Sequence, residues 1–231
     1  MKRGSWLLLA AIGACFAARV SAQFVTPNLL SNPGSEMGLS SWNIIAGPPR
    51  PDNGNFDPGI NPRTGMFDFV GANNNPFAQL DQTIDLIATG QVTAPQLDSG
   101  STTADVSFWE QGLNQGSPSD NAAIQLSFLD ASGTLISMVT TATVDSHTGS
   151  WANGAQSFLV PVGTRFITYS MLFQRNVGSD NDAFIDDNSL TLTIAPVPEP
   201  ATVALLLAGL PVTALALRRL RRTKTGLRSS A

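Results

Sequence analysis

Short apolar stretches alternate with clusters of turn-forming residues along the chain from Gln23 to Ala195. No stretch of this region keeps a helical period over twelve residues, and only 86–92 has the pattern of a helical turn. A two-residue alternation of apolar and polar side chains, which is typical of strands, recurs along the region. The clearest predicted strands are 103–110, 122–130, 135–144, 165–174 and 184–194.

The alternation also predicts how the strands face. Ala104, Val106 and Phe108 share one face of the first of these strands, whereas 165–174 is apolar on both parities, as expected of a strand covered on both faces. Turn residues at 130–133 predict a hairpin. Several short strands without a long internal repeat indicate an all-β fold, namely a two-sheet jelly-roll β-sandwich.

The segment 1–22 has the layout of a signal peptide. Two basic residues open it, the apolar run 6–18 follows, and small residues at 20–22 precede the expected cleavage site. This layout predicts export of the region that follows. The alternative is a lipoprotein in which Cys15 becomes the lipid-modified first residue.

An apolar run at 201–217 is followed at once by a basic cluster at 218–224. Seventeen residues of helix span about 26 Å, slightly less than a bilayer core of about 30 Å. Basic residues flank the cytoplasmic ends of membrane helices, so the C-terminus is expected in the cytoplasm and the preceding domain outside. The expected cytoplasmic stop consists of Arg218, Arg219, Arg221 and Arg222.

A short motif, Val197, Pro198, Glu199 and Pro200, stands directly before the apolar run. Motif, short span and basic stop in this order resemble the PEP-CTERM sorting signal. The resemblance implies that an exosortase-type membrane enzyme processes the protein at the inner membrane, after which it is placed on the cell surface or in the extracellular matrix. The alternative is an ordinary tail anchor that is never cut.

These features divide the chain into four parts. They are the signal peptide 1–22, the β-sandwich domain 23–195, the sorting signal 196–224 (motif 197–202, transmembrane helix 201–217, basic cluster 218–224) and the tail 225–231.

Charge is divided unevenly along the chain. All 17 acidic residues lie between Gln23 and Pro200, with only four of the 13 basic residues, so this region has a formal net charge of −13. Such a region repels phosphate backbones, which argues against nucleic-acid binding, and it favours divalent cations. The four basic residues are Arg50, Arg63, Arg165 and Arg175.

Several segments resemble galactose-binding-like jelly rolls, a group that includes many carbohydrate-binding modules. The opening 28–38 (NLLSNPGSEMG), followed by Trp42, is similar to the start of these domains, and 160–165 with 182–190 is similar to their final two strands. The segment 79–86 (QLDQTIDL) is similar to the F-box-associated, glycan-binding branch. The resemblance implies the fold, whereas fold alone does not fix the ligand.

The same resemblance implies a structural calcium ion. In these modules an early glutamate and a late aspartate commonly bind calcium, and Glu36 and Asp186 match the two positions, with Asp187 as an alternative for the second. Calcium takes about six to eight oxygen ligands, many of them backbone carbonyls. Without calcium, these carboxylates would cap backbone N–H groups or pair with an arginine.

Aromatic side chains suggest where a glycan could bind, because the apolar face of a sugar stacks on an exposed indole. Trp109 has the outward parity of Asp105 and Ser107, and Trp151 lies in a predicted loop, whereas Trp42 is expected in the core. We therefore expect Trp109 and Trp151 to form a platform. The expected partners for sugar hydroxyls are Glu110 and Gln111.

Catalysis is not expected. Cys15 is the only cysteine and His147 the only histidine, so the domain 23–195 has no disulfide, no thiol nucleophile and no multi-histidine metal centre. No nucleophile-elbow motif is present either. The expected function is an exported, non-catalytic β-sandwich that binds glycan or exopolysaccharide. The alternatives are a structural matrix component with no specific ligand and a secreted polysaccharide hydrolase with paired carboxylates.

Overall fold

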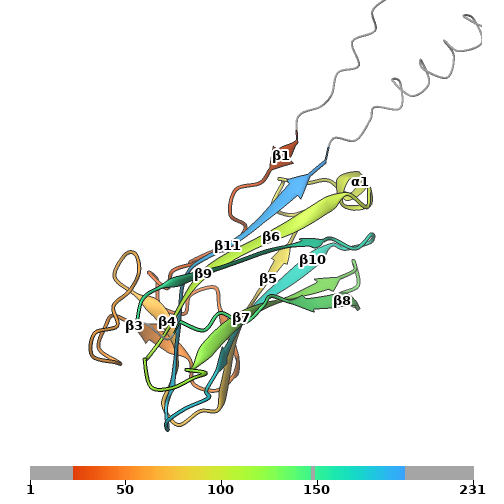
Figure 1. Ribbon diagram of the computed structural model, residues 1–231. Coiled ribbons are helices and arrows are strands. Elements are labelled where there is room, and N and C mark those ends of the chain that lie inside the picture. The colour runs from red at the N-terminus through yellow and green to blue at the C-terminus, as the bar shows by residue number, and fades with distance from the viewer. Residues whose placement is uncertain (1–22, 147–148, 196–231) are drawn as a thin grey trace, which may run out of the picture. The chain divides into compact units, whose positions relative to one another are not determined.

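Two antiparallel sheets make up the computed structural model, which describes residues 23–146 and 149–195 (Figure 1). The six-stranded sheet has the spatial order β3-β4-β11-β6-β9, and β1 pairs with the C-terminal end of the long strand β11. Its strands are β1 (Phe24–Val25), β3 (Arg50–Asp52), β4 (Asp68–Ala72), β6 (Thr102–Gly112), β9 (Ala152–Leu159) and β11 (Asn181–Ile194).

The five-stranded sheet has the order β2-β5-β10-β7-β8. Its strands are β2 (Asn43–Ala46), β5 (Phe77–Asp85), β7 (Asn121–Leu129), β8 (Leu135–Thr140) and β10 (Phe166–Gln174). Described residues from Gln23 to Ala195 form one unit, so the predicted all-β, two-sheet sandwich is confirmed.

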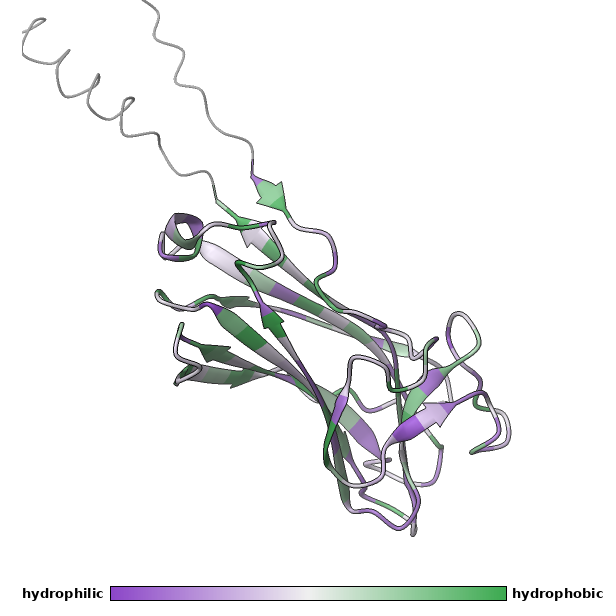
Figure 2. Ribbon diagram, turned by 180° about the vertical axis from the view of Figure 1, so that it is seen from behind, coloured by the Kyte–Doolittle hydropathy of each residue, from purple (hydrophilic) through white to green (hydrophobic). Residues whose placement is uncertain are grey.

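The core lies between the inner faces of the two sheets. Along β6 the buried side chains are Ala104, Val106 and Phe108, as the alternation predicts. Hydrophobic and hydrophilic positions also alternate along the other long strands in Figure 2. A fully buried aliphatic or phenyl side chain contributes about 1.5 to 3 kcal/mol, so this two-residue alternation fixes the register of the sheet.

Trp42 is a core residue, which confirms its interpretation from the sequence. It is 6% exposed, and its indole N–H donates to the carbonyl of Asn32 at 2.9 Å. Its ring packs edge-on against Phe69 and Tyr169, with centroid distances of 5.5 and 6.1 Å. The hydrogen bond satisfies the only polar group that the indole brings into the core.

The helical turn predicted at 86–92 is wrong in position. Residues 86–89 form a non-helical turn, and the helix α1 (Ala94–Leu97) follows. Thr93 and Gln96 form a capping box at its start, and Pro95 lies in its first turn, where a missing N–H costs nothing.

The predicted strand 135–144 is too long at its C-terminal end. β8 ends at Thr140, and beyond it only Val144 makes a bridge, to Ala122. Ile136 and Met138 are 40% and 54% exposed, because the register turns the alternate residues of β8 toward the core.

A β-bulge in β11 changes which residues share a face. Pairing with β6 shifts between Asp186 and Ser189, where Asp187 has a positive φ of 48°. Phe184 therefore packs on the outer face of the six-stranded sheet, whereas Leu190 belongs to the core. Alternation along 184–194 alone would place Asp186, Phe184 and Leu190 on one face, and this expectation is wrong because an inserted residue reverses the parity.

Candidate functional site

The outer face of the six-stranded sheet carries a row of small polar side chains. Because directly paired residues lie on the same face, Asp105 of β6 lies beside Ser157 of β9 and Thr191 of β11. In the next row Ser107 is paired with Ala155 and with Ser189.

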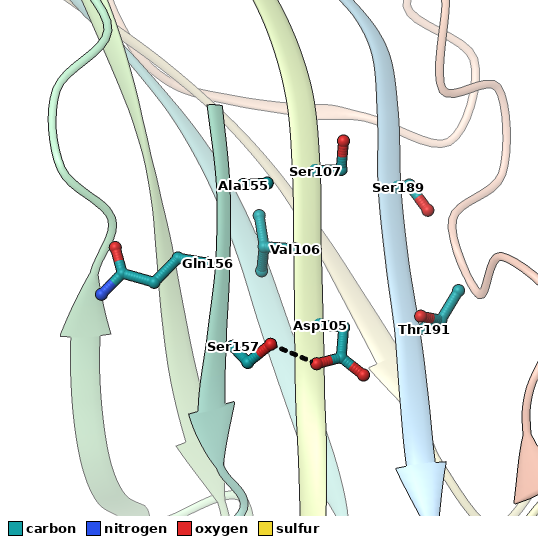
Figure 3. Close-up of a pocket in the computed structure, with 8 residues that line it drawn as sticks. All are labelled: Asp105, Val106, Ser107, Ala155, Gln156, Ser157, Ser189 and Thr191. Atoms are coloured by element: carbon teal, nitrogen blue, oxygen red, sulfur yellow. Dashed lines mark hydrogen bonds between the residues drawn. The ribbon is translucent and has the colours of Figure 1, made fainter. Parts of the chain in front are cut away.

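These small side chains leave a hollow of about 520 Å³ over β9, β6 and β11 (Figure 3). Ligand sites in proteins have volumes of about 300 to 1,000 Å³, so the hollow has the size of a binding site. It is lined by Asp105, Val106, Ser107, Ala155, Gln156, Ser157, Ser189 and Thr191.

Asp105 is the only charged residue in this lining. One carboxylate oxygen accepts the Ser157 hydroxyl, as Figure 3 shows, and the other accepts the Thr193 hydroxyl at 2.6 Å. The two hydroxyls hold the carboxylate in place, and each of its oxygens has lone-pair capacity left for a further donor.

A long loop, residues 53–67 between β3 and β4, covers the neighbouring part of the same face. Phe56 and Ile60 of this loop pack in a small hydrophobic cluster with Val70, Ala72 and Phe184. The loop follows an Asx-type turn in which Asp52 accepts the N–H groups of residues 54 and 56.

Trp109 and Trp151 come together on this outer face, at the end of the hollow. Trp109 is paired with Asn153 of β9, and Trp151 directly precedes β9, so the two indoles are diagonal neighbours. Both are half-buried, because the loop 53–67 contacts them. The Arg63 guanidinium lies 3.7 Å from the centre of the Trp109 ring, and the Trp151 N–H donates to the carbonyl of Asn61 at 3.2 Å.

Glu110 and Gln111 do not line the hollow. Glu110 is fully buried on the inner side, where one oxygen accepts the Ser146 N–H at 3.0 Å and the other has no hydrogen-bond partner. Burial, opposed by this hydrogen bond and assisted by Asp145, raises the pKa of Glu110 to about 8. Gln111 is 3% exposed and pairs with Phe184 beneath the loop.

Glu36, Asp186 and Asp187 all bind the segment 63–67. Glu36 accepts the N–H groups of Met66 and Phe67 at 2.9 and 3.1 Å. These bonds match the capping alternative for Glu36, and the sequence correctly places the three acids in one region. Asp186 accepts the N–H groups of Arg63 and Thr64 at 2.9 and 3.1 Å. Asp187 accepts the Thr64 hydroxyl at 2.6 Å and forms an ion pair with the Arg63 guanidinium.

Asp68 is an additional acid in this region that the sequence analysis did not single out. It is fully buried, and neither of its carboxylate oxygens has a hydrogen-bond partner. Burial, with the charges of Asp52 and Asp186, raises the pKa of Asp68 to about 9. Burial also raises the pKa of Asp186, to about 7.

Among residues 23–146 and 149–195, no group of three or more His, Cys, Asp and Glu side chains is arranged to hold a metal ion. Structural calcium at Glu36, Asp186 and Asp187 therefore stays a prediction. The sorting residues 197–200 and the four arginines within 218–222 lie outside the described residues. In the described part, no helix is long and apolar enough to cross a membrane.

Comparison with known proteins supports the fold. No family model matches the sequence, and no curated protein matches it. The enzymatically active domain of tailspike protein 4 from bacteriophage CBA120 matches with a TM-score of 0.51 and 15% identity. The match covers 71% of this chain and 21% of that chain, so this chain spans about a fifth of the tailspike domain.

Two carbohydrate-binding modules are also among the similar structures. A family 61 module in complex with β-1,4-galactotriose has 22% identity and a TM-score of 0.47, over 71% of this chain and 98% of that chain. A family 16 module has 15% identity and a TM-score of 0.49, over 71% and 99%. Both modules have TM-scores below 0.5, so no property of this chain is inferred from them. The tailspike match, at 15% identity, shows a shared fold alone.

Proposed function

We propose that the region 23–195 is a non-catalytic glycan-binding domain, and that a polysaccharide binds in the hollow on the outer face of the six-stranded sheet. The observation that carries this proposal is the hollow itself, about 520 Å³ in volume with a lining of hydroxyl, amide and carboxylate groups. Sugars present hydroxyl groups that both donate and accept hydrogen bonds, so a lining of this chemistry matches them.

Asp105 is the central acceptor in this proposal. Its carboxylate is already oriented by Ser157 and Thr193, so it accepts a sugar hydroxyl without losing further side-chain freedom. Hydrogen bonds to a charged acceptor are about twice as strong as neutral ones. Asp105 therefore provides the strongest single contact in the lining.

Trp109 supports the proposal in a different way from the platform expected from the sequence. Arg63 stacks on the ring, so one face of the indole is already occupied. The Arg63–Trp109 pair instead forms an end wall beside Ser107, with a guanidinium that donates hydrogen bonds. In this arrangement a glycan would run along β6 and end against the pair.

The composition of the hollow supports binding without hydrolysis. Glycosidases use two carboxyl groups, about 5 to 10 Å apart. Of the residues that line the hollow, Asp105 alone has a carboxylate. Glu110, the acid nearest in sequence, is on the other side of β6 and fully buried.

The sequence supports a location for this binding activity. The signal-peptide layout at 1–22 and the PEP-CTERM-like order of 197–224 favour an exported protein that an exosortase-type enzyme processes at the inner membrane. In this proposal the domain then binds polysaccharide at the cell surface or in the extracellular matrix.

A tryptophan at position 155 should abolish glycan binding. Ala155 is exposed on the floor of the hollow, so the Ala155→Trp side chain fills it without disturbing the core. The matched control is Ser127→Trp, which adds the same indole to the outer face of the five-stranded sheet. Binding is measured on a glycan array and then by calorimetry with the best polysaccharide.

Asp105→Ala should weaken the same binding by at least about tenfold, because a hydrogen bond to a charged group contributes about 1.5 to 3 kcal/mol. Equal binding by Ala155→Trp and the wild type would place the glycan elsewhere. A wild-type domain that binds no glycan would favour the structural matrix component.

A further inference from the structure

The carboxylate of Asp105 and the hydroxyl groups beside it present hydrogen-bond acceptors to the hollow. Ser157 donates its hydroxyl hydrogen to one carboxylate oxygen, and Thr193 donates its own to the other (Figure 3 shows the first of these bonds). A hydroxyl group has one hydrogen and two lone pairs, so both hydroxyl oxygens keep acceptor capacity after this donation. A ligand group that binds at Asp105 must therefore supply the hydrogens for the new bonds.

Asp105 has no ion-pair partner within the part of the chain that the structure describes. The domain 23–195 contains four arginines and no lysine. Arg63 is paired with Asp187, and Arg165 is paired with Asp98. The other two arginines contact a phenyl ring and a backbone carbonyl. The negative charge of Asp105 is therefore met only by neutral hydroxyl groups and remains available to a ligand cation.

The net charge of the domain acts in the same direction. Its formal value is −13, and such a surface attracts cations and repels anions over about 8 Å at physiological salt. None of the described residues that line the hollow is basic. A polysaccharide rich in carboxylate or sulfate groups is therefore repelled from the hollow, whereas a polysaccharide that carries positive charge is attracted to it.

Building on the glycan-binding function proposed above, on which this step depends, we infer that the hollow binds a cationic polysaccharide. Its amino sugars lack the acetyl group and carry ammonium groups, one of which pairs with Asp105. An ammonium group brings three N–H donors and a positive charge, which match an oriented carboxylate with acceptor hydroxyls beside it. A sugar hydroxyl brings one donor and no charge, so it fits the same position less well.

The next row of the hollow complements this arrangement with a donor. The hydroxyl oxygen of Ser107 accepts the side-chain amide of Asn153 at 3.1 Å, so the hydroxyl hydrogen of Ser107 is left for a ligand oxygen. Ser107 is two residues from Asp105 on the same face of β6, which places it about 7 Å further along the strand. The ammonium group therefore binds at Asp105, and hydroxyl or ring oxygens of the same glycan lie against Ser107.

Three β-1,4-linked oligosaccharides of equal length test this specificity, because they differ only at the second carbon of each ring. Glucosamine carries an ammonium group there, N-acetylglucosamine an acetamide and glucose a hydroxyl. Calorimetry with the purified full chain, at low salt and at a pH that keeps the amine protonated, should show at least about fivefold tighter binding of the glucosamine oligomer. Raising the salt to about 1 M shortens the screening length to about 3 Å and should remove most of this difference.

Two matched variants separate the pairing at Asp105 from the general charge of the domain. Asp105→Asn keeps the size of the side chain and removes its charge, so it should lower the affinity for the glucosamine oligomer to that for the other two. Asp81→Asn makes the same change in net charge on the outer face of the five-stranded sheet, where its neighbour Leu80 faces the core, and should keep the preference. A difference between the two variants therefore reports the contact in the hollow.

A wild type that binds the three oligosaccharides equally, or binds an uncharged one more tightly, overturns the cationic specificity and leaves glycan binding itself standing. This comparison needs no variant, so it holds even if Asp105→Asn fails to fold. A folded Asp105→Asn that keeps the preference also overturns it, because the ammonium group then binds elsewhere. A wild type that binds none of the three overturns it as well, and the glycan array separately decides whether the domain binds any glycan.

Discussion

Between about pH 5.5 and pH 7.5, the wild-type protein should lose about 2 to 3 kcal/mol of stability relative to the Glu110→Gln variant. Glu110 is fully buried, and burial raises its pKa from 4.5 to about 8. In the folded state the carboxyl group therefore keeps its proton up to about pH 8, whereas in the unfolded chain it loses the proton near pH 4.5.

The direction of this change in stability with pH follows from proton binding. In the window between the two pKa values, the folded state binds more protons than the unfolded state, so the free energy of unfolding falls as the pH rises. Each unit of pKa difference corresponds to about 1.4 kcal/mol. Glutamine keeps an oxygen that accepts the Ser146 N–H but never ionises, so the variant lacks this contribution.

Urea unfolding at the two pH values measures the effect. Other acids whose pKa values are raised, such as Asp57 and Asp68, add their own pH dependence to both proteins, so the quantity to compare is the difference between variant and wild type. Asp81→Asn, which removes an acid from the surface, should not change the slope. If the free energy of unfolding changes equally with pH in Glu110→Gln and in the wild type, Glu110 ionises in the folded state without cost.

The alternation of apolar residues correctly predicts β6, β7, β10 and most of β11, together with the inward face of β6, because burial of one parity fixes the register. The long strands β5 and β9 are not among the predicted ones. The same reasoning fails at β11. A single inserted residue between Asp186 and Ser189 reverses the parity, and nothing in the local pattern marks it. In the structure, Asp187 within the bulge has a positive φ, a conformation that aspartate tolerates better than most residues.

The candidate site is only partly visible in the sequence. The outward parity of Asp105, Ser107 and Trp109 correctly identifies the face. Its other walls come from β9 and β11, which pair with β6 from distant parts of the chain, so the hollow exists only once the register is known. The cover of Trp109 by Arg63 is equally non-local, because no pattern relates a loop residue to a strand that follows about 40 positions later.

The acids show the same limit. Sequence similarity brings Glu36 and Asp186 to one region, and the structure shows that their partners are backbone N–H groups of the segment 63–67. Main-chain donors carry no sequence signal, so capping and metal binding cannot be told apart from residue types alone. Asp57 and Asp182 are a further case, since their contact with each other becomes visible only in the folded chain.

Glu199→Ala should leave the protein in the inner membrane with its C-terminal tail intact. Glu199 lies outside the described residues, so this prediction rests on the sequence, where Glu199 is the only acid between Pro196 and Ala231. Two flanking prolines restrict the backbone around Glu199, and we expect its carboxylate at the outer boundary of the predicted span. A membrane enzyme that grips this motif loses the only negative charge there.

Cell fractionation and mass spectrometry of the C-terminus measure this effect. The expected change is close to all-or-none, from a shortened surface form to a full-length membrane form. The control is Arg228→Ala, which alters the tail beyond the basic cluster and should leave processing unchanged. Normal removal of the tail in Glu199→Ala would show that processing does not depend on Glu199, whereas an intact tail in the wild type would show that 201–217 is an ordinary anchor. Glycan binding by the domain 23–195 would stand in either case, because the hollow lies within the described residues and does not involve the tail.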